Sequence, residues 1–259
     1  PSRIEPFAGI ADVADFPRDI QPILDKHCTA CHDPDRREGD VDLTGDRTPC
    51  YSQSYLTMIK KRLIADGRNG GGNRLPRTIG SSASRIMKLI DGQHHDVHVS
   101  ARERQQIVLW LETGATYAGT YAAYFSGMVS VKFPVAEMTR HCGQCHGIKP
   151  GRQRKLAWEG YDTRPWTSLP FEFGDEGPAS TLCNLSHPEK SLLLLAPLER
   201  QAGGYGICKP RSAVADTNSP PVLANTSDPI YRQLLAAIGD AARRLGIVGL
   251  NQLELRIAG

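Results

Sequence analysis

Two pentapeptides of this chain place two cysteines and a histidine at a fixed spacing. Residues 28–32 read Cys-Thr-Ala-Cys-His, and residues 142–146 read Cys-Gly-Gln-Cys-His. At this spacing two thiols can reach the two vinyl groups of one porphyrin, and the adjoining histidine lies under the iron as its proximal ligand. The sequence therefore predicts two haem c groups, attached and ligated by Cys28, Cys31, His32, Cys142, Cys145 and His146.

Two other chemistries use closely spaced cysteines. Structural zinc takes four ligands, often from paired Cys-x-x-Cys units, and a Cys-x-x-Cys pair can also act as a thiol redox centre. Here each cysteine pair has its own adjoining histidine, and the two motifs lie in separate stretches that are each the size of a domain. This arrangement favours two covalent haems over a zinc site or a redox dithiol.

The iron of an electron carrier usually has a second axial ligand, most often histidine or methionine. For the first haem, the block His94-His95-Asp-Val-His98 lies where small cytochromes carry a methionine-bearing loop. We expect the distal ligand to be His95 or His94, with a slight preference for His95. Met87 is a weaker alternative because its helical spacing is typical of a core residue, and the histidines could also be solvated loop residues.

The second haem has fewer candidate ligands. The corresponding loop, residues 203–208, contains no histidine. We expect His187 to be the ligand, because it begins an apolar segment that matches the one before the first histidine block. The alternatives are an open iron, a histidine from elsewhere or from another subunit, or one of Tyr205, Cys208 and Met128.

Helices are expected on both sides of each motif. Apolar residues at helical spacing predict that residues 19–27 and 135–141 form helices leading into the motifs. Downstream, residues 81–90 and 186–195 are expected as short apolar helices, the second opened by a capping box of Ser186 and Glu189.

Each half then closes with a longer amphipathic helix. The first is expected to begin at the capping box formed by Ser100 and Glu103. The second is expected to begin at Asp228, which is followed by Pro229 in the first turn. Together these elements describe one plan used twice along the chain.

The expected fold is mostly α, with two tandem cytochrome c-like domains and long irregular loops. The 259 residues suffice for two domains, and a hydrophobic content of 40% supports real cores. The 25 glycines and 18 prolines indicate many turns. We place the first haem domain at 14–117, an aromatic-rich connector at 118–130 and the second haem domain at 131–245.

Composition also limits the partners and the compartment. A net charge of +3 does not favour nucleic acid, and no apolar stretch of about 18 residues predicts a membrane span. Covalent haem attachment indicates an exported protein, periplasmic or extracellular, whose signal peptide is not in this chain. Cys50, Cys183 and Cys208 remain for a disulfide, and the sequence does not decide their pairing.

Three segments of the chain resemble one protein family. Residues 19–32, 92–100 and 188–198 read DIQPILDKHCTACH, GQHHDVHVS and PEKSLLLLAPL. They are similar to the haem-bearing C-terminal region of hydrazine synthase alpha subunits, and the most specific part is the histidine block. In that family one alpha-subunit haem is catalytic and has a tyrosine ligand just past its motif, whereas residues 33–36 here contain no tyrosine. The resemblance therefore implies the di-haem scaffold rather than the reaction.

Three functions follow from this scaffold. The first is a di-haem c-type cytochrome that transfers single electrons between redox partner proteins. The second is a haem enzyme, or a subunit of one, acting on a small nitrogen or oxygen species at a haem with an open distal side. The third is a subunit that self-associates or joins a multi-haem electron-conducting assembly.

Overall fold

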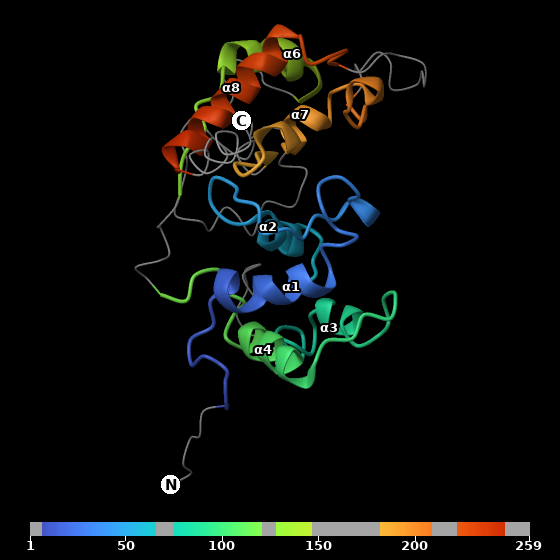
Figure 1. The fold of residues 1–259 in the computed structure, drawn as a ribbon, viewed down its shortest axis with the longest axis vertical. Coiled ribbons are helices and arrows are strands. Elements are labelled where there is room, and N and C mark those ends of the chain that lie inside the picture. Colours follow the sequence, from blue (N-terminus) through green and yellow to red (C-terminus); the bar gives the residue numbers. More distant parts are fainter. Residues whose placement is uncertain (1–6, 66–74, 121–127, 147–181, 209–221, 247–259) are drawn as a thin grey trace, which may run out of the picture. The chain divides into compact units, whose positions relative to one another are not determined.

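A computed structural model describes residues 7–65, 75–120, 128–146, 182–208 and 222–246 (Figure 1). Within these ranges the chain forms two compact units. The first unit comprises described residues of 7–45 and 51–120, and the second those of 46–50 and 128–246. The regular elements of the described part are helices, and its isolated β-bridges include Asp91–His98 and Leu198–Leu223. None of the described helices is long and apolar enough to cross a membrane.

The first unit begins with two consecutive helical segments that lead into the first motif. A π-helical turn, η1 (Phe16–Ile20), continues into α1 (Gln21–His27). Asp15 caps η1 by accepting a hydrogen bond from the backbone N–H of Arg18 at 3.1 Å. Both segments carry proline in their first turn, where its missing N–H costs no hydrogen bond. The helix expected over 19–27 is therefore confirmed and begins earlier than the apolar spacing suggested.

Two further helices enclose the core of the first unit. The helix α4 (Ala101–Glu112) begins with the expected capping box between Ser100 and Glu103, which is confirmed. The helix α2 (Gln53–Lys60), capped by the Ser52 hydroxyl, was not expected from the sequence. Between these elements lies an aromatic cluster with ring centroids 4.8–6.5 Å apart, made by Phe16, Tyr51, Tyr55, Trp110 and Tyr117.

Trp110 packs inside the first unit as part of this aromatic cluster. This side chain is fully buried, and its indole N–H donates to the Thr116 carbonyl at 2.8 Å. Its ring neighbours are Phe16 at 5.3 Å and Tyr55 at 6.5 Å between centroids. Trp110 is therefore a core residue whose polar atom is satisfied internally.

The helix expected over 81–90 is much shorter in the structure. Only α3 (Ile86–Leu89) is helical, and the preceding serines form turns. The Ser84 hydroxyl donates to the Gly80 carbonyl and accepts from the Ala65 N–H, while Ser81 donates to Glu112. Serine side chains that bond to nearby backbone groups compete with helix formation, which explains the late start.

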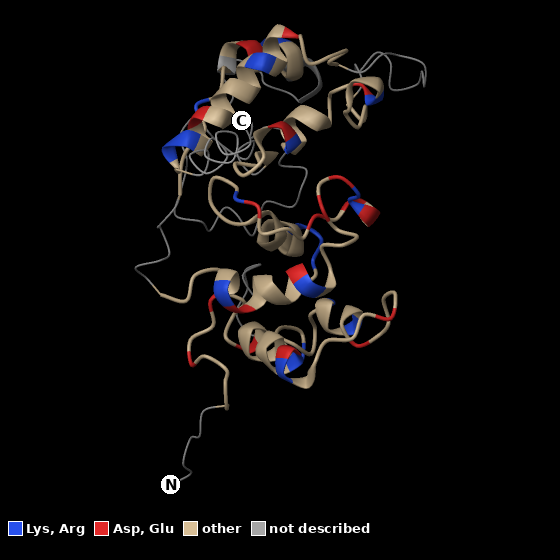
Figure 2. Cartoon of the chain, viewed as in Figure 1, with Lys and Arg blue, Asp and Glu red and all other residues tan. Residues whose placement is uncertain are grey.

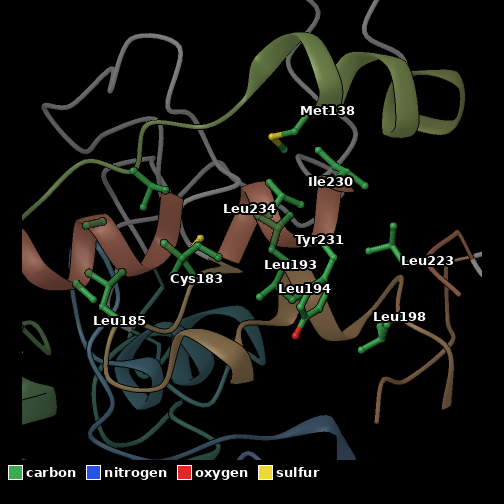
Figure 3. Close-up of a cluster of buried hydrophobic side chains, with 14 residues drawn as sticks. Met138, Cys183, Leu185, Leu193, Leu194, Leu198, Leu223, Ile230, Tyr231 and Leu234 are labelled. Atoms are coloured by element: carbon green, nitrogen blue, oxygen red, sulfur yellow. The ribbon is translucent and has the colours of Figure 1, made fainter. Parts of the chain in front are cut away.

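The second unit packs three helices around an apolar core. These are α6 (Val135–His146), α7 (Leu192–Leu195) and α8 (Pro229–Arg244), with the 3₁₀ turns η6 (Pro188–Lys190) and η7 (Arg200–Ala202) between them. Asp228 caps α8 as expected, by accepting from the Ile230 N–H at 2.9 Å. Figure 3 shows side chains of the cluster, which include Met138, Leu185, Leu194, Leu198, Ile230, Tyr231 and Leu234.

The capping box expected at Ser186 is wrong. The Ser186 hydroxyl accepts the backbone N–H of Arg47 at 2.9 Å, and the segment begins as η6 with His187 as its first flanking residue. Ser191 has an extended ψ of 128°, so it separates η6 from α7. The Ser186 hydroxyl, which the local sequence predicts to cap the helix, is instead bonded to Arg47, 139 residues away along the chain.

That contact belongs to a segment that joins the second unit although it lies early in the sequence. Leu185 donates its N–H to the Arg47 carbonyl at 2.7 Å, and Val129 donates to the Pro49 carbonyl at 3.0 Å. Residues 46–50 therefore belong to the second unit, although the rest of that unit begins at residue 128 of the described chain. The domain bounds 14–117 and 131–245, drawn around haem-binding domains, stay a prediction.

Candidate functional site

The first motif lies on a turn that continues α1. The N–H of Cys28 donates to the Leu24 carbonyl at 2.8 Å, and the N–H of His32 donates to the Cys28 carbonyl at 3.1 Å. These helical hydrogen bonds bring both cysteines and the histidine onto one turn. Cys31 is exposed, whereas burial, with a smaller contribution from Asp25, raises the pKa of the Cys28 thiol to about 11. Both thiols are thus held at the end of one helix, with Cys31 open to the solvent.

The ring of His32 is held in one tautomer. Its Nδ1 lies 3.0 Å from the carbonyl oxygen of Glu38, in the 3₁₀ turn η2 (Glu38–Asp40). A carbonyl oxygen only accepts, so Nδ1 donates and the neutral ring keeps its lone pair on Nε2. The backbone of His32 is also fixed, because its carbonyl accepts the Leu43 N–H at 2.8 Å. A ligating histidine whose other ring nitrogen donates to a carbonyl is the usual arrangement at protein metal sites.

The histidine block forms a tight loop that is closed at its base. Asp91 and His98 form an antiparallel bridge, and the Gly92 N–H donates to the Val97 carbonyl at 3.0 Å. His95 and Asp96 both adopt left-handed backbone conformations, with φ of +48° and +56°. Such strain in non-glycine residues persists only where the surrounding structure fixes it, and it is frequent at functional sites.

This loop places His94 beside His32. The ring centroids are 5.8 Å apart and the ring planes differ by 16°. His94 is partly buried, whereas His95 is exposed and meets the His94 ring edge-on at 4.6 Å. Burial first, and then the neighbouring His95 and His32, lower the pKa of His94, which favours the neutral ring that a metal needs. Of the two ligands expected from the sequence, the structure brings His94 to the first motif.

The donor set of the first motif fits a haem. Cys28 and Cys31 lie on the turn that carries His32, and His94 offers a second imidazole whose ring centroid is 5.8 Å from that of His32. The Glu38 carbonyl fixes the tautomer of His32. These residues could hold a haem iron.

The second motif lies inside α6. The helix ends at His146, so Cys142, Cys145 and His146 occupy its last turns at positions i, i+3 and i+4. Cys142 is partly buried. The side chains of Cys145 and His146 lie outside the described part of the chain.

The expected second ligand, His187, is oriented by a carboxylate. Its Nδ1 lies 3.1 Å from Oδ2 of Asp46, and the Asn184 side-chain amide donates to the same oxygen at 2.6 Å. The His187 backbone N–H also donates to Oδ1 of Asn184 at 2.8 Å. Because a carboxylate accepts, Nδ1 donates, and in the neutral ring Nε2 then carries the lone pair on a side chain that is 52% exposed. His187 is thus prepared to ligate a metal, as a carboxylate-supported histidine is.

The three remaining cysteines all belong to the second unit. Cys50 and Cys183 are buried and Cys208 is partly buried. Burial raises the pKa of Cys50 to about 12 and also raises that of Cys183. The pairing of these cysteines stays a prediction.

Several residues that shape the site were not expected from the sequence. Glu38 acts through its backbone carbonyl, which any residue could supply, so its identity carries no signal. Asp46 is far from His187 in the sequence and gives no local signal either. Gly92, with φ of +84°, could have been recognised as a turn residue next to the histidine block. Within the described ranges, no group of three or more His, Cys, Asp and Glu side chains is arranged to hold a metal ion by itself.

Comparisons with known proteins add one relationship. No family model matches the chain, and no solved structure matches it. The alpha subunit of hydrazine synthase from Kuenenia stuttgartiensis is 27% identical over 124 residues. This similarity covers 40% of the present chain and 15% of that protein, so the chain corresponds to a small part of its relative. The chain is distantly similar to part of a hydrazine synthase alpha subunit.

Proposed function

We propose that this chain is an exported di-haem c-type cytochrome that transfers single electrons between redox partners. The observation that carries the proposal is the pairing of His32, adjoining Cys28 and Cys31, with His94 at a ring separation of 5.8 Å. The repetition of the Cys-x-x-Cys-His motif at residues 142–146 and the distant similarity to hydrazine synthase subunit alpha support it.

At the first site each residue has a distinct role. The thiols of Cys28 and Cys31 would hold the haem by adding S–H across its two vinyl groups. Nε2 of His32 would be the proximal ligand, because Nδ1 is engaged by the Glu38 carbonyl. His94 would be the distal ligand. A haem bound there supplies a one-electron iron couple, and two ligands from fixed protein elements keep rearrangement on electron transfer small.

At the second site, Cys142 and Cys145 would attach the haem and His146 would be its proximal ligand. His187 is the proposed distal ligand, since Asp46 holds its Nδ1 and leaves Nε2 for the metal. Both proposed sites therefore use a histidine whose second ring nitrogen is engaged by a protein oxygen.

The optical spectrum of the purified protein tests this function. Expression with the machinery for covalent haem attachment, followed by reduction with dithionite, should give a low-spin α band at the position of c-type haem. The absence of such a band would overturn the proposal. Replacement of the cysteine pair Cys28 and Cys31 by serine should remove half of the bound haem.

A second function is favoured by the similarity to a subunit of hydrazine synthase, whose name refers to nitrogen chemistry. In this case one haem, more readily the second, would lack a protein ligand on its distal side and bind a small nitrogen species. Carbon monoxide binding to the reduced protein separates the two functions. A carrier with two ligands on each iron should resist carbon monoxide, whereas an enzyme should bind it at one iron per chain.

A further inference from the structure

Glu103 lies between the two elements that present the candidate ligands of the first site. The helix α1 ends at His27, one residue before the first attachment cysteine. The helix α4 begins at Ala101, directly after the loop that carries His94. Figure 2 shows charges of both signs at these two helix ends.

The Glu103 carboxylate receives hydrogen bonds from both sides of the site. From α1, Lys26 Nζ donates to Oε1 at 2.8 Å and His27 Nε2 donates to Oε2 at 3.2 Å. From the other side, the backbone N–H of Ser100 donates to Oε2 at 2.7 Å. The Glu103 side chain is only 17% exposed, so these contacts are partly shielded from water.

These contacts distinguish Glu103 from an ordinary helix cap. The capping box alone needs only Ser100 and Glu103. Lys26 and His27 lie 77 and 76 residues earlier in the chain, and they directly precede the first motif. Charge-assisted hydrogen bonds are shorter and stronger than neutral ones, so one carboxylate joins the proximal and distal elements firmly.

We propose that Glu103 is a positioning residue that fixes the spacing between His32 and His94. The inference rests on the proposed function, since it assigns Glu103 a part in the ligation of the first haem. By holding the end of α1 against the start of α4, Glu103 keeps the histidine loop over the motif. Without its charge, the loop would move away from His32 more often and expose the iron.

The substitution Glu103→Gln separates this role from helix capping. Glutamine also serves at this position of a capping box, so the start of α4 is retained. The charge that holds Lys26 and His27 is removed. Glu112→Gln is the matched control, because Glu112 lies on the same helix and accepts two hydrogen bonds from Ser81, at 2.9 and 2.6 Å, far from the motif in sequence.

The measurement is carbon monoxide binding to the dithionite-reduced full chain, together with the oxidised absorption spectrum. In Glu103→Gln we expect the fraction of the first haem that binds carbon monoxide to rise about tenfold, the scale set by one hydrogen bond to a charged group. Its reduction potential should shift as well. Glu112→Gln should match the wild type in all three readouts.

Equal behaviour of the two variants would overturn the inference and leave the proposed function intact. Absence of covalent haem in the wild type would instead overturn the proposed function. If Glu103→Gln does not fold, the double variant Lys26→Met with His27→Leu keeps the capping box and removes both hydrogen bonds from α1 to Glu103. It should show the same gain in carbon monoxide binding, and an unchanged spectrum would count against the role of Glu103.

Discussion

The imidazole rings of His32 and His94 lie nearly parallel, with centroids 5.8 Å apart and planes 16° apart. The two residues come from different elements, the turn after α1 and the loop before α4. The tautomer of His32 is set by the Glu38 carbonyl, so its free nitrogen is available to a metal. This relationship distinguishes His94 from its neighbour His95, which the sequence slightly favoured.

In the proposed di-haem protein, His94→Ala should leave the first iron with His32 as its remaining protein ligand. The reduced protein should then bind one additional carbon monoxide per chain and gain high-spin character. His95→Ala is the control, since His95 is exposed and contacts the His94 ring rather than His32. If His95→Ala produces the change and His94→Ala does not, the ligand assignment is reversed.

Gly92→Ala should disturb the distal loop specifically. At Gly92 φ is +84°, and an added Cβ would lie 2.4 Å from Cε1 of His98. Gly114 has a similar φ of +96° with nothing within 4 Å, so Gly114→Ala measures the backbone strain alone. We expect Gly114→Ala to lose about 1–2 kcal/mol of unfolding free energy through backbone strain, and Gly92→Ala to lose more because His98 must also move.

Only Gly92→Ala should also change the spin state of the first haem, because the displaced His98 lies in the same loop as His94. Absorption and electron paramagnetic resonance spectra of the two variants measure this difference. Identical spectra would argue against the idea that the conformation of this loop sets the position of His94.

Asp46→Asn should destabilise the second unit. The carboxylate of Asp46 is 14% exposed and receives hydrogen bonds from Asn184 and His187. Loss of its charge should lower the free energy of unfolding by about 1–3 kcal/mol. Asp240→Asn on α8 removes an exposed carboxylate from pairs with Arg243 and Arg244, and should cost less than about 1 kcal/mol. Urea unfolding followed by circular dichroism compares the two, and equal costs would contradict the role of Asp46.

The contribution of Glu103 to stability should depend on pH. Hydrogen bonds from Lys26 and Ser100 lower its pKa from 4.5 to about 2, with a smaller contribution from His27. A carboxyl whose pKa is lowered in the folded state contributes its full stabilisation of the fold at pH values above its unfolded-state pKa. This stabilisation is lost as the pH falls through the folded-state pKa. The stability difference between wild type and Glu103→Gln should therefore be constant above about pH 5 and shrink between pH 4.5 and 2. Chemical denaturation across this range measures it, and a difference that does not narrow would contradict the pairing.

The sequence predicts most reliably those features that depend on neighbouring residues. The starts of α4 and α8 were correct, because Ser100 and Asp228 bond to N–H groups two or three residues ahead. The shortness of α3 was not predicted, because the Ser84 hydroxyl bonds to the backbone of Gly80 and Ala65. The capping box predicted at Ser186 was wrong, because its hydroxyl accepts the N–H of the distant Arg47.

Which of two adjacent histidines lies next to His32 also could not be predicted from neighbouring residues. Which of His94 and His95 faces the motif depends on the left-handed backbone at His95 and Asp96. The local amino-acid sequence does not specify that backbone conformation. The proposed attachment residues need no tertiary information, because their spacing alone predicts haem attachment.

The intact mass of the denatured protein counts the haems that are covalently attached to it. After production with covalent haem attachment, we expect a polypeptide carrying two haems. We expect one haem in a variant with Cys142 and Cys145 replaced by serine, and one in the equivalent variant of Cys28 and Cys31. A mass equal to that of the unmodified polypeptide would overturn the proposed di-haem cytochrome.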